Sequence, residues 1–205
     1  MGQLELWDQS LTLWINSFNS PFTDSIWVFF SNRFVWIPLY LAVAGMLIWR
    51  LGWKKGLVAV FGIILTILCV DQFCNLIKAW VGRLRPCMDE NVVAQGLHVL
   101  EGASFKHRFG FFSGHSANAF AFALGSVLAF RLDSRLCHVE SSKIYVNPWL
   151  KAYSVCVFIW AALVAISRVF VGKHFFGDIT VGFFVGLLFA YVIYLIYSKI
   201  ARAYL

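Results

Sequence analysis

Long apolar runs with few charges constrain this chain more than any other feature of its sequence. A helix needs about 20 apolar residues to cross a bilayer, and fewer when terminal Arg or Lys side chains reach back to the interface. Only 13% of the residues are charged, whereas an average soluble domain has about 25%. The chain is therefore predicted to be an all-α integral membrane protein, a helical bundle of about five transmembrane helices. The spans are expected at 34–50, 56–81, 112–131, 151–168 and 177–199.

The N-terminal segment, residues 1–32, has a different pattern. Its apolar residues recur at three- and four-residue steps and line one helical face: Leu4, Trp7, Leu11, Trp14, Ile15 and Phe18. This pattern predicts an amphipathic helix that lies in the membrane interface, packs on the bundle, or does both. Residues 22–32 are too short to cross a bilayer alone, so they either extend the first span or lie in the interface. The whole chain, residues 1–205, is expected to form a single membrane domain.

Lysine and arginine residues divide almost evenly between the two sides of such a bundle. The positive-inside rule alone therefore does not orient it. If the cations of 82–112 and 168–178 bind a phosphate, they drop out of the comparison, and the opposite side faces the cytoplasm. The two segments then lie together on the outer face. Five spans also place the N-terminus outside, whereas a six-span arrangement would place it inside.

The remaining polar features predict little chemistry. Three of the five cysteines lie in apolar runs, and Cys87 and Cys137 fall on opposite faces of the bilayer. We therefore expect neither a disulfide framework nor a C-x-x-C metal site. The polar segment 132–150 is expected to be a solvated loop.

Three polar clusters share the outer side. They are Lys78 with Arg83, Arg85 and Pro86; Ser113, Gly114 and His115; and Arg168, Lys173, His174 and Asp178. Cations and fixed donors near helix starts suit a phosphate group, and two histidines suit a nucleophile and a general acid. Asp178 follows His174 by one helical turn, so its carboxylate can hold the imidazole in one tautomer. The clusters together indicate phosphoryl chemistry.

These residues resemble the three-part signature of the type-2 phosphatidic acid phosphatase family, which is related to bacterial acid phosphatases and vanadium haloperoxidases. The resemblance covers roughly residues 56–200. One departure is Phe112, which stands where the family pattern usually has proline. The matching positions, in order, are Lys78, Arg85-Pro86, Ser113-Gly114-His115, Ser167-Arg168, His174 and Asp178.

The resemblance implies a metal-independent mechanism without a cofactor. His174 would attack phosphorus and form a phosphohistidine, and Asp178 would orient its ring. His115 would protonate the leaving oxygen and then help to activate water. The residues implied in binding the phosphate are Lys78, Arg85, Arg168, Ser113 and Gly114.

Several neighbours of the signature have open roles. Arg83 contacts a second phosphate or headgroup, or only solvent, and Ser167 contacts the phosphate or only supports Arg168. Asp71 lies two helical turns before Lys78 and is expected to have a partner inside the bundle. The cations that precede the second cluster, Lys106, His107 and Arg108, guide an anionic headgroup or are simply solvated. Lys173 is expected to be solvated or at headgroup level.

The predicted function is that of a lipid phosphatase in a bacterial inner membrane, with its site on the periplasmic face. Its substrate would be a lipid phosphomonoester or pyrophosphate, with undecaprenyl pyrophosphate as the first choice. Phosphatidylglycerol phosphate, phosphatidic acid and a lipid A phosphate are also compatible. A lipid phosphotransferase and a non-enzymatic protein that binds anionic lipids are the alternatives. No nucleic acid and no obligate protein partner are expected.

Overall fold

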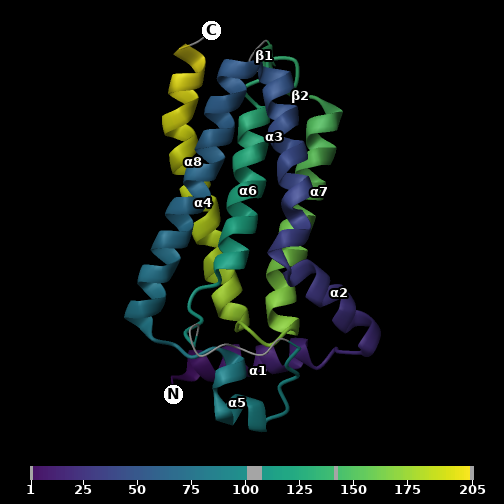
Figure 1. Cartoon of the computed structure of the whole chain (residues 1–205), viewed down its shortest axis with the longest axis vertical. Helices are drawn as coiled ribbons and strands as arrows, with labels where there is room; N and C mark the ends of the chain where they lie inside the picture. Colours follow the sequence, from purple (N-terminus) through teal and green to yellow (C-terminus); the bar gives the residue numbers. More distant parts are fainter. Residues whose placement is uncertain (1, 101–107, 141–142, 204–205) are drawn as a thin grey trace.

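The computed structural model describes residues 2–100, 108–140 and 143–203. Five helices stand side by side and alternate in direction along the chain (Figure 1). They are α3 (Ile37–Leu51), α4 (Trp53–Val81), α6 (Gly114–Phe130), α7 (Pro148–Phe170) and α8 (Phe176–Ala203). The N-terminus therefore lies at one end of the bundle and the C-terminus at the other.

Four helical segments of the described chain are long and apolar enough to cross a membrane. They are Arg33–Leu51, Trp53–Val81, Pro148–Phe170 and Phe176–Ile200. The fifth upright helix, α6, has 17 residues and lies at the centre, in contact with α3, α4, α7 and α8. The expected all-α membrane bundle is thus confirmed, whereas the limits of each span within the bilayer stay predictions.

Helices α6 and α8 pack backbone against backbone in their first turns. A Cβ atom added to Gly186 would lie 2.2 Å from the carbonyl oxygen of Ala117, and one added to Gly182 would lie 2.6 Å from that of Ser113. Only glycine allows so close an approach. The backbone N–H of Ser113 donates to the carbonyl oxygen of Asp178 at 3.0 Å. This packing brings the start of α6 beside the start of α8.

The end of the bundle at which α6 and α8 begin is covered by shorter elements. Helix α1 (Gln3–Asn16) lies across it, and α2 (Pro21–Ser31) slopes from there toward α7 (Figure 1). A capping box between Ser20 and Thr23 starts α2, and extended backbone at Asn32 ends it before the short 3-10 helix η1 (Arg33–Trp36). The segment expected at 22–32 therefore forms a helix of its own and does not extend the first span. A second short 3-10 helix, η2 (Pro86–Met88), and α5 (Glu90–Ala94) complete this end.

Helix α1 turns its apolar face outward and its polar face inward. Trp7 and Trp14 are 71% and 61% exposed, whereas Thr12 and Asn16 are buried. Tryptophan on an exposed apolar face suits the membrane interface, while buried polar side chains need partners in the protein. Both expectations for this helix, interfacial placement and packing on the bundle, are therefore compatible with one orientation.

The opposite end of the bundle is closed by an antiparallel hairpin, β1 (Cys137–Glu140) and β2 (Lys143–Val146). The expectation of a solvated loop over 132–150 is wrong in this respect. The side chain of Asn147 accepts from the backbone N–H of Trp149 at 2.9 Å, and Pro148 occupies the first helical position, so α7 begins inside that segment. Asp133 accepts from Arg50 and Arg135 at 2.9 Å each and ties this end to α3.

Candidate active site

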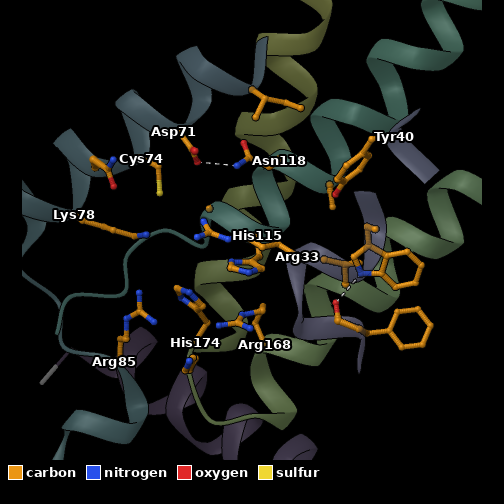
Figure 2. A pocket seen from close by; sticks show the side chains of 18 residues that line it. Arg33, Tyr40, Asp71, Cys74, Lys78, Arg85, His115, Asn118, Arg168 and His174 are labelled. Atoms are coloured by element: carbon orange, nitrogen blue, oxygen red, sulfur yellow. Dashed lines mark hydrogen bonds between the residues drawn. The ribbon is translucent and has the colours of Figure 1, made fainter. Parts of the chain in front are cut away.

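A cavity of about 800 Å³ opens at the end of the bundle where α6 and α8 begin. Figure 2 shows side chains from separate parts of the chain converging on it. Its polar wall includes Lys78, Arg85, Gly114, His115, Arg168 and His174. Its apolar wall includes Phe30, Trp36, Tyr40, Ile67 and Val164. The cavity therefore combines a cationic pocket with a surface suited to hydrocarbon.

His174 lies in the tight connection between α7 and α8. Gly172 allows the turn with a φ of 76°, and the N–H of His174 donates to the carbonyl of Arg168 at 3.1 Å. The imidazole is 2% exposed. Burial, and then the charges of Arg168, Arg85 and Lys78, lower the pKa of His174 well below its ordinary value. The ring is therefore neutral near pH 7, as a nucleophile requires.

Asp178 stands directly behind the imidazole. Its Oδ2 lies 3.3 Å from Nδ1 of His174 and accepts the backbone N–H of Phe175 at 3.0 Å. A proton held on Nδ1 by this carboxylate leaves Nε2 with its lone pair. The carboxylate is fully buried, so it needs further partners to remain charged.

The start of α6 brings His115 to the same cavity. Ser113 is the N-cap residue, and its Oγ accepts from the N–H of Ser116 at 3.4 Å. Ser113 is fully buried and lies outside the cavity lining. Its side chain acts here as a cap, and its contact with the phosphate stays a prediction. Gly114 does line the cavity, and a Cβ atom there would lie 3.9 Å from Nζ of Lys78.

The cations reach the cavity from different supports. Lys78 belongs to the last turn of α4, which ends at Gly82 in the left-handed conformation. Arg85 follows in an extended stretch whose N–H donates to the carbonyl of Arg108 at 2.9 Å, while its Nε donates to that of Phe109 at 3.2 Å. Burial lowers the pKa of Arg85, but a guanidinium remains charged under all ordinary conditions.

Arg168 is held from the N-terminal part of the chain. It is 3% exposed and donates to both the carbonyl and the hydroxyl of Ser31, at the end of α2. The sequence contains no local signal for this contact, because the two residues are far apart along the chain. Arg33 also lines the cavity, although no role was predicted for it from the sequence. Lys173, which was expected to be solvated or at headgroup level, lines the cavity as well.

The secondary residues take the following places. Arg83 lies outside the cavity lining and donates to Oδ1 of Asp178 at 3.0 Å and to Oδ2 of Asp8 at 2.7 Å. The structure gives Arg83 two ion pairs, and its contact with a second phosphate or headgroup stays a prediction. Ser167 is fully buried and donates to Val164 of its own helix at 2.7 Å.

Asp71 lines the cavity and accepts from the side chain of Asn118 at 2.7 Å (Figure 2). Asn118 had no predicted role. Arg108 is exposed beside Phe109, and the expectation that Lys106 and His107 guide a headgroup lies outside the described residues. Within the described chain, histidine, cysteine and carboxylate side chains form no group of three that could hold a metal ion.

Comparison with known proteins decides the family. The family model of the PAP2 superfamily matches residues 55–202. The chain belongs to the PAP2 superfamily. The lipid A 4'-phosphatase of Bacteroides thetaiotaomicron is 31% identical to this PAP2 protein over 194 residues, which cover 94% of this chain and 78% of that protein. The phosphatidylglycerophosphatase B of Bacillus subtilis is 31% identical over 171 residues, which cover 81% and 70%.

A solved structure shows the same fold. It is that of a transmembrane PAP2-type phosphatidylglycerolphosphate phosphatase from Bacillus subtilis, with a TM-score of 0.74 and 20% identity, over 98% of this chain and 89% of that chain. The match to the family model confirms the family predicted from the three-part signature. This PAP2 protein is an integral membrane enzyme, a phosphatase that acts on a lipid.

Proposed function

We propose that this protein hydrolyses the phosphate monoester of a membrane lipid through a phosphohistidine on His174. One observation carries the proposal: two histidines and three signature cations, from elements far apart in the sequence, line one cavity. Asp178 backs one of the histidines. Binding a phosphate requires only the cations. A nucleophile, a proton donor and an orienting carboxylate in one place support hydrolysis instead.

In the first step, Nε2 of His174 forms a bond to phosphorus while the bond from phosphorus to the lipid oxygen breaks. His115 gives a proton to that oxygen, which leaves as a hydroxyl group. Asp178 stabilises the charge that develops on the attacking imidazole. Lys78, Arg85 and Arg168 oppose the charge spread over the phosphoryl oxygens.

In the second step, water displaces the imidazole. His115, now neutral, takes a proton from the attacking water, and inorganic phosphate leaves with His174 restored. The polar wall serves both steps, because the phosphoryl group stays under the same cations. The apolar wall keeps the lipid tail in a hydrocarbon-like environment during both.

We infer that the 4'-phosphate of a lipid A-type glycolipid is the first substrate to test. The relative that carries this activity in its name matches 94% of this chain, and a cavity of about 800 Å³ is large enough for a phosphorylated sugar. This choice replaces undecaprenyl pyrophosphate as the first substrate, and undecaprenyl pyrophosphate is tested as an alternative substrate. Phosphatidylglycerol phosphate is the other alternative, because a relative of equal identity bears that name.

The test is phosphate release from these three lipids in detergent, with and without EDTA. We expect lipid A 4'-phosphate to give the highest kcat/KM, EDTA to leave it unchanged, and His174→Ala to abolish it. His138→Ala, at the opposite end of the bundle, is the matched histidine control. Loss of activity in EDTA would overturn the metal-independent mechanism. Wild-type turnover by a folded His174→Ala protein would overturn the nucleophile assignment.

The proposed location is a bacterial inner membrane with the cavity on its periplasmic side. Cys87 in η2 lies at the cavity end and Cys137 in β1 lies at the other end, and both are partly exposed. A membrane-impermeant thiol reagent applied to intact spheroplasts should label Cys87 and spare Cys137. Variants that lack one or the other cysteine identify the labelled site. The reverse pattern would invert the orientation.

A further inference from the structure

The buried polar face of α1 contacts the end of α7 and the start of α8, the two helices that flank His174. The side-chain amide of Asn16 donates to the carbonyls of Val169 and Phe170, at 3.0 and 3.1 Å, at the end of α7. The hydroxyl of Thr12 accepts the N–H of Phe176 at 2.9 Å, at the start of α8. One helix therefore holds both sides of the connection that carries His174.

Asp8, on the same face, makes the decisive contacts. Its Oδ1 accepts the N–H of Gly177 at 2.6 Å, and its Oδ2 accepts from Arg83 at 2.7 Å. A carboxylate at a helix N-terminus is favourable because the first N–H groups there have no partner within the helix. Asp8 thus binds the start of α8 and a cation at once.

Arg83 connects Asp8 to the dyad formed by Asp178 and His174. Its Nη1 donates to Oδ1 of Asp178 at 3.0 Å, the oxygen that faces away from the imidazole. Its guanidinium also lies over the ring of Phe175, 3.9 Å from the centroid. Asp178 is fully buried, and the side chains of Arg83 and Asp8 are 19% and 14% exposed. The three groups form a partly to fully desolvated chain that ends at His174.

We propose that Asp8 and Arg83 are positioning residues for the phosphohistidine chemistry, acting through Asp178. Arg83 fixes the carboxylate that aims His174, and Asp8 fixes Arg83 and the first turn of α8. Neither touches the lipid or the reacting phosphoryl group. The orientation of the nucleophile thereby depends on α1, the helix whose exposed tryptophans are predicted to lie in the membrane interface. The inference rests on the proposed role of His174.

A positioning role predicts a particular kinetic signature. A nucleophile displaced by about 1 Å can lose about 100-fold in rate while the binding groups stay in place. Arg83→Gln and Asp8→Asn should therefore lower kcat by about 10- to 100-fold and change KM by less than about threefold. Arg83→Lys should lose less activity than Arg83→Gln, because lysine keeps the positive charge. It should not reach the wild-type kcat, because an ammonium group does not reproduce the hydrogen bonds of the guanidinium to both Asp178 and Asp8.

A double-variant cycle tests the connection. If Asp8 acts through Arg83, Asp8→Asn should have almost no further effect on kcat in an Arg83→Gln enzyme. The matched control is Asp24→Asn, which removes a carboxylate from another side-chain hydrogen bond at this end, to Nε2 of His98 at 3.0 Å. This control should keep the wild-type kcat. Thermal melting in detergent and the KM for lipid establish that each variant is folded.

A further variant covers the case in which a charge deletion prevents folding. A Cβ atom on Gly177 would lie 2.8 Å from Oδ2 of Asp8, so Gly177→Ala should displace Asp8 without removing any charge. Alanine is also a better helix former than glycine. We expect Gly177→Ala to lower kcat in the same direction as Asp8→Asn.

The results separate this inference from the proposed function. Wild-type kcat in Asp8→Asn and Gly177→Ala, in an enzyme that still requires His174, would overturn the positioning role alone. Fully multiplicative losses in the double variant, or a raised KM with unchanged kcat, would also overturn it. A folded His174→Ala enzyme with wild-type turnover would instead reject the mechanism on which the inference rests.

Discussion

Asp178→Asn changes one atom of the buried dyad and tests the tautomer argument directly. Oδ1 of Asp178 accepts from Arg83, and Oδ2 accepts from Phe175 and faces Nδ1 of His174. Asparagine has one oxygen and one NH₂ group, so it can serve only one of these two sides.

Each orientation of the asparagine has a definite consequence. If its oxygen stays with Arg83, its NH₂ group faces Nδ1 of His174, which must then accept. The ring proton moves to Nε2 and blocks the attacking atom. If the amide turns round, NH₂ faces the guanidinium and two buried donors oppose each other. The loss of the negative charge also removes the stabilisation of the imidazolium in both orientations.

The size of the effect follows from these losses. An equivalent aspartate-to-asparagine change behind a catalytic histidine lowers kcat by about 10⁴ through the wrong tautomer. The dyad here is as buried, so we expect a fall of about 10³ to 10⁴, or about 4 to 5.5 kcal/mol in the activation free energy. KM should change little, because Asp178 does not line the cavity.

The assay is steady-state phosphate release together with rapid-quench measurement of the phosphoenzyme. Phosphoenzyme formation should be slowed as much as kcat, because the attack itself is impaired. A folded Asp178→Asn enzyme with kcat within tenfold of wild type would refute the tautomer argument.

Four further predictions concern stability and pH. Gly186→Ala should destabilise the protein by about 1 to 3 kcal/mol, because its Cβ would lie 2.2 Å from the carbonyl of Ala117 and the helices must move apart. Thermal melting in detergent measures the loss of stability. Gly45→Ala is the control, because Gly45 has open space around it. Asp133→Asn should lower the Tm by about 2 to 4 °C and leave kcat unchanged, because it breaks the contacts with Arg50 and Arg135 far from the cavity. Burial raises the pKa of Asp133, but the hydrogen bonds from Arg135 and Arg50 outweigh it and hold the pKa below its usual value. The contribution of Asp133 to stability should therefore be complete above about pH 4 and decline only at lower pH. A contribution already lost at pH 5 would contradict this. Because the pKa of His174 is lowered, the acid limb of kcat/KM should lie below about pH 6.5, and a limb centred above pH 7 would show that His174 is not the group that titrates.

The helical bundle and the family were predictable from the sequence because their signals are local. Each span is a continuous apolar run, and each part of the signature occupies a short stretch of chain. His174 and Asp178 are one helical turn apart, so their contact follows from helix geometry. The expected lipid phosphatase is confirmed at the level of family and reaction class, while the lipid itself and the role of each site residue remain proposals.

The contacts that hold the signature in place were not predictable in the same way. Asp8 and Arg83 are 75 residues apart, and Arg168 and Ser31 are 137 apart. Nothing in either local pattern marks these pairs, because the contacts arise only when α1 and α2 fold back over the end of the bundle. Asp8 also looks like an ordinary polar residue on an amphipathic helix. The partly buried ion pair between Asp8 and Arg83 could therefore be identified only from the structure.

Ile67 and Val164 complete the apolar wall of the cavity from α4 and α7, but its other named residues come from a part of the chain that carries none of the signature residues. This separation has a consequence for how such enzymes diversify. The apolar wall draws on α2, η1 and α3 through Phe30, Trp36 and Tyr40, whereas the signature cations and histidines come from α4 onward. A segment exchange over residues 21–51 could therefore graft the lipid preference of one relative onto the chemistry of another. Such a chimera must retain Ser31, because Arg168 bonds to it across the graft boundary.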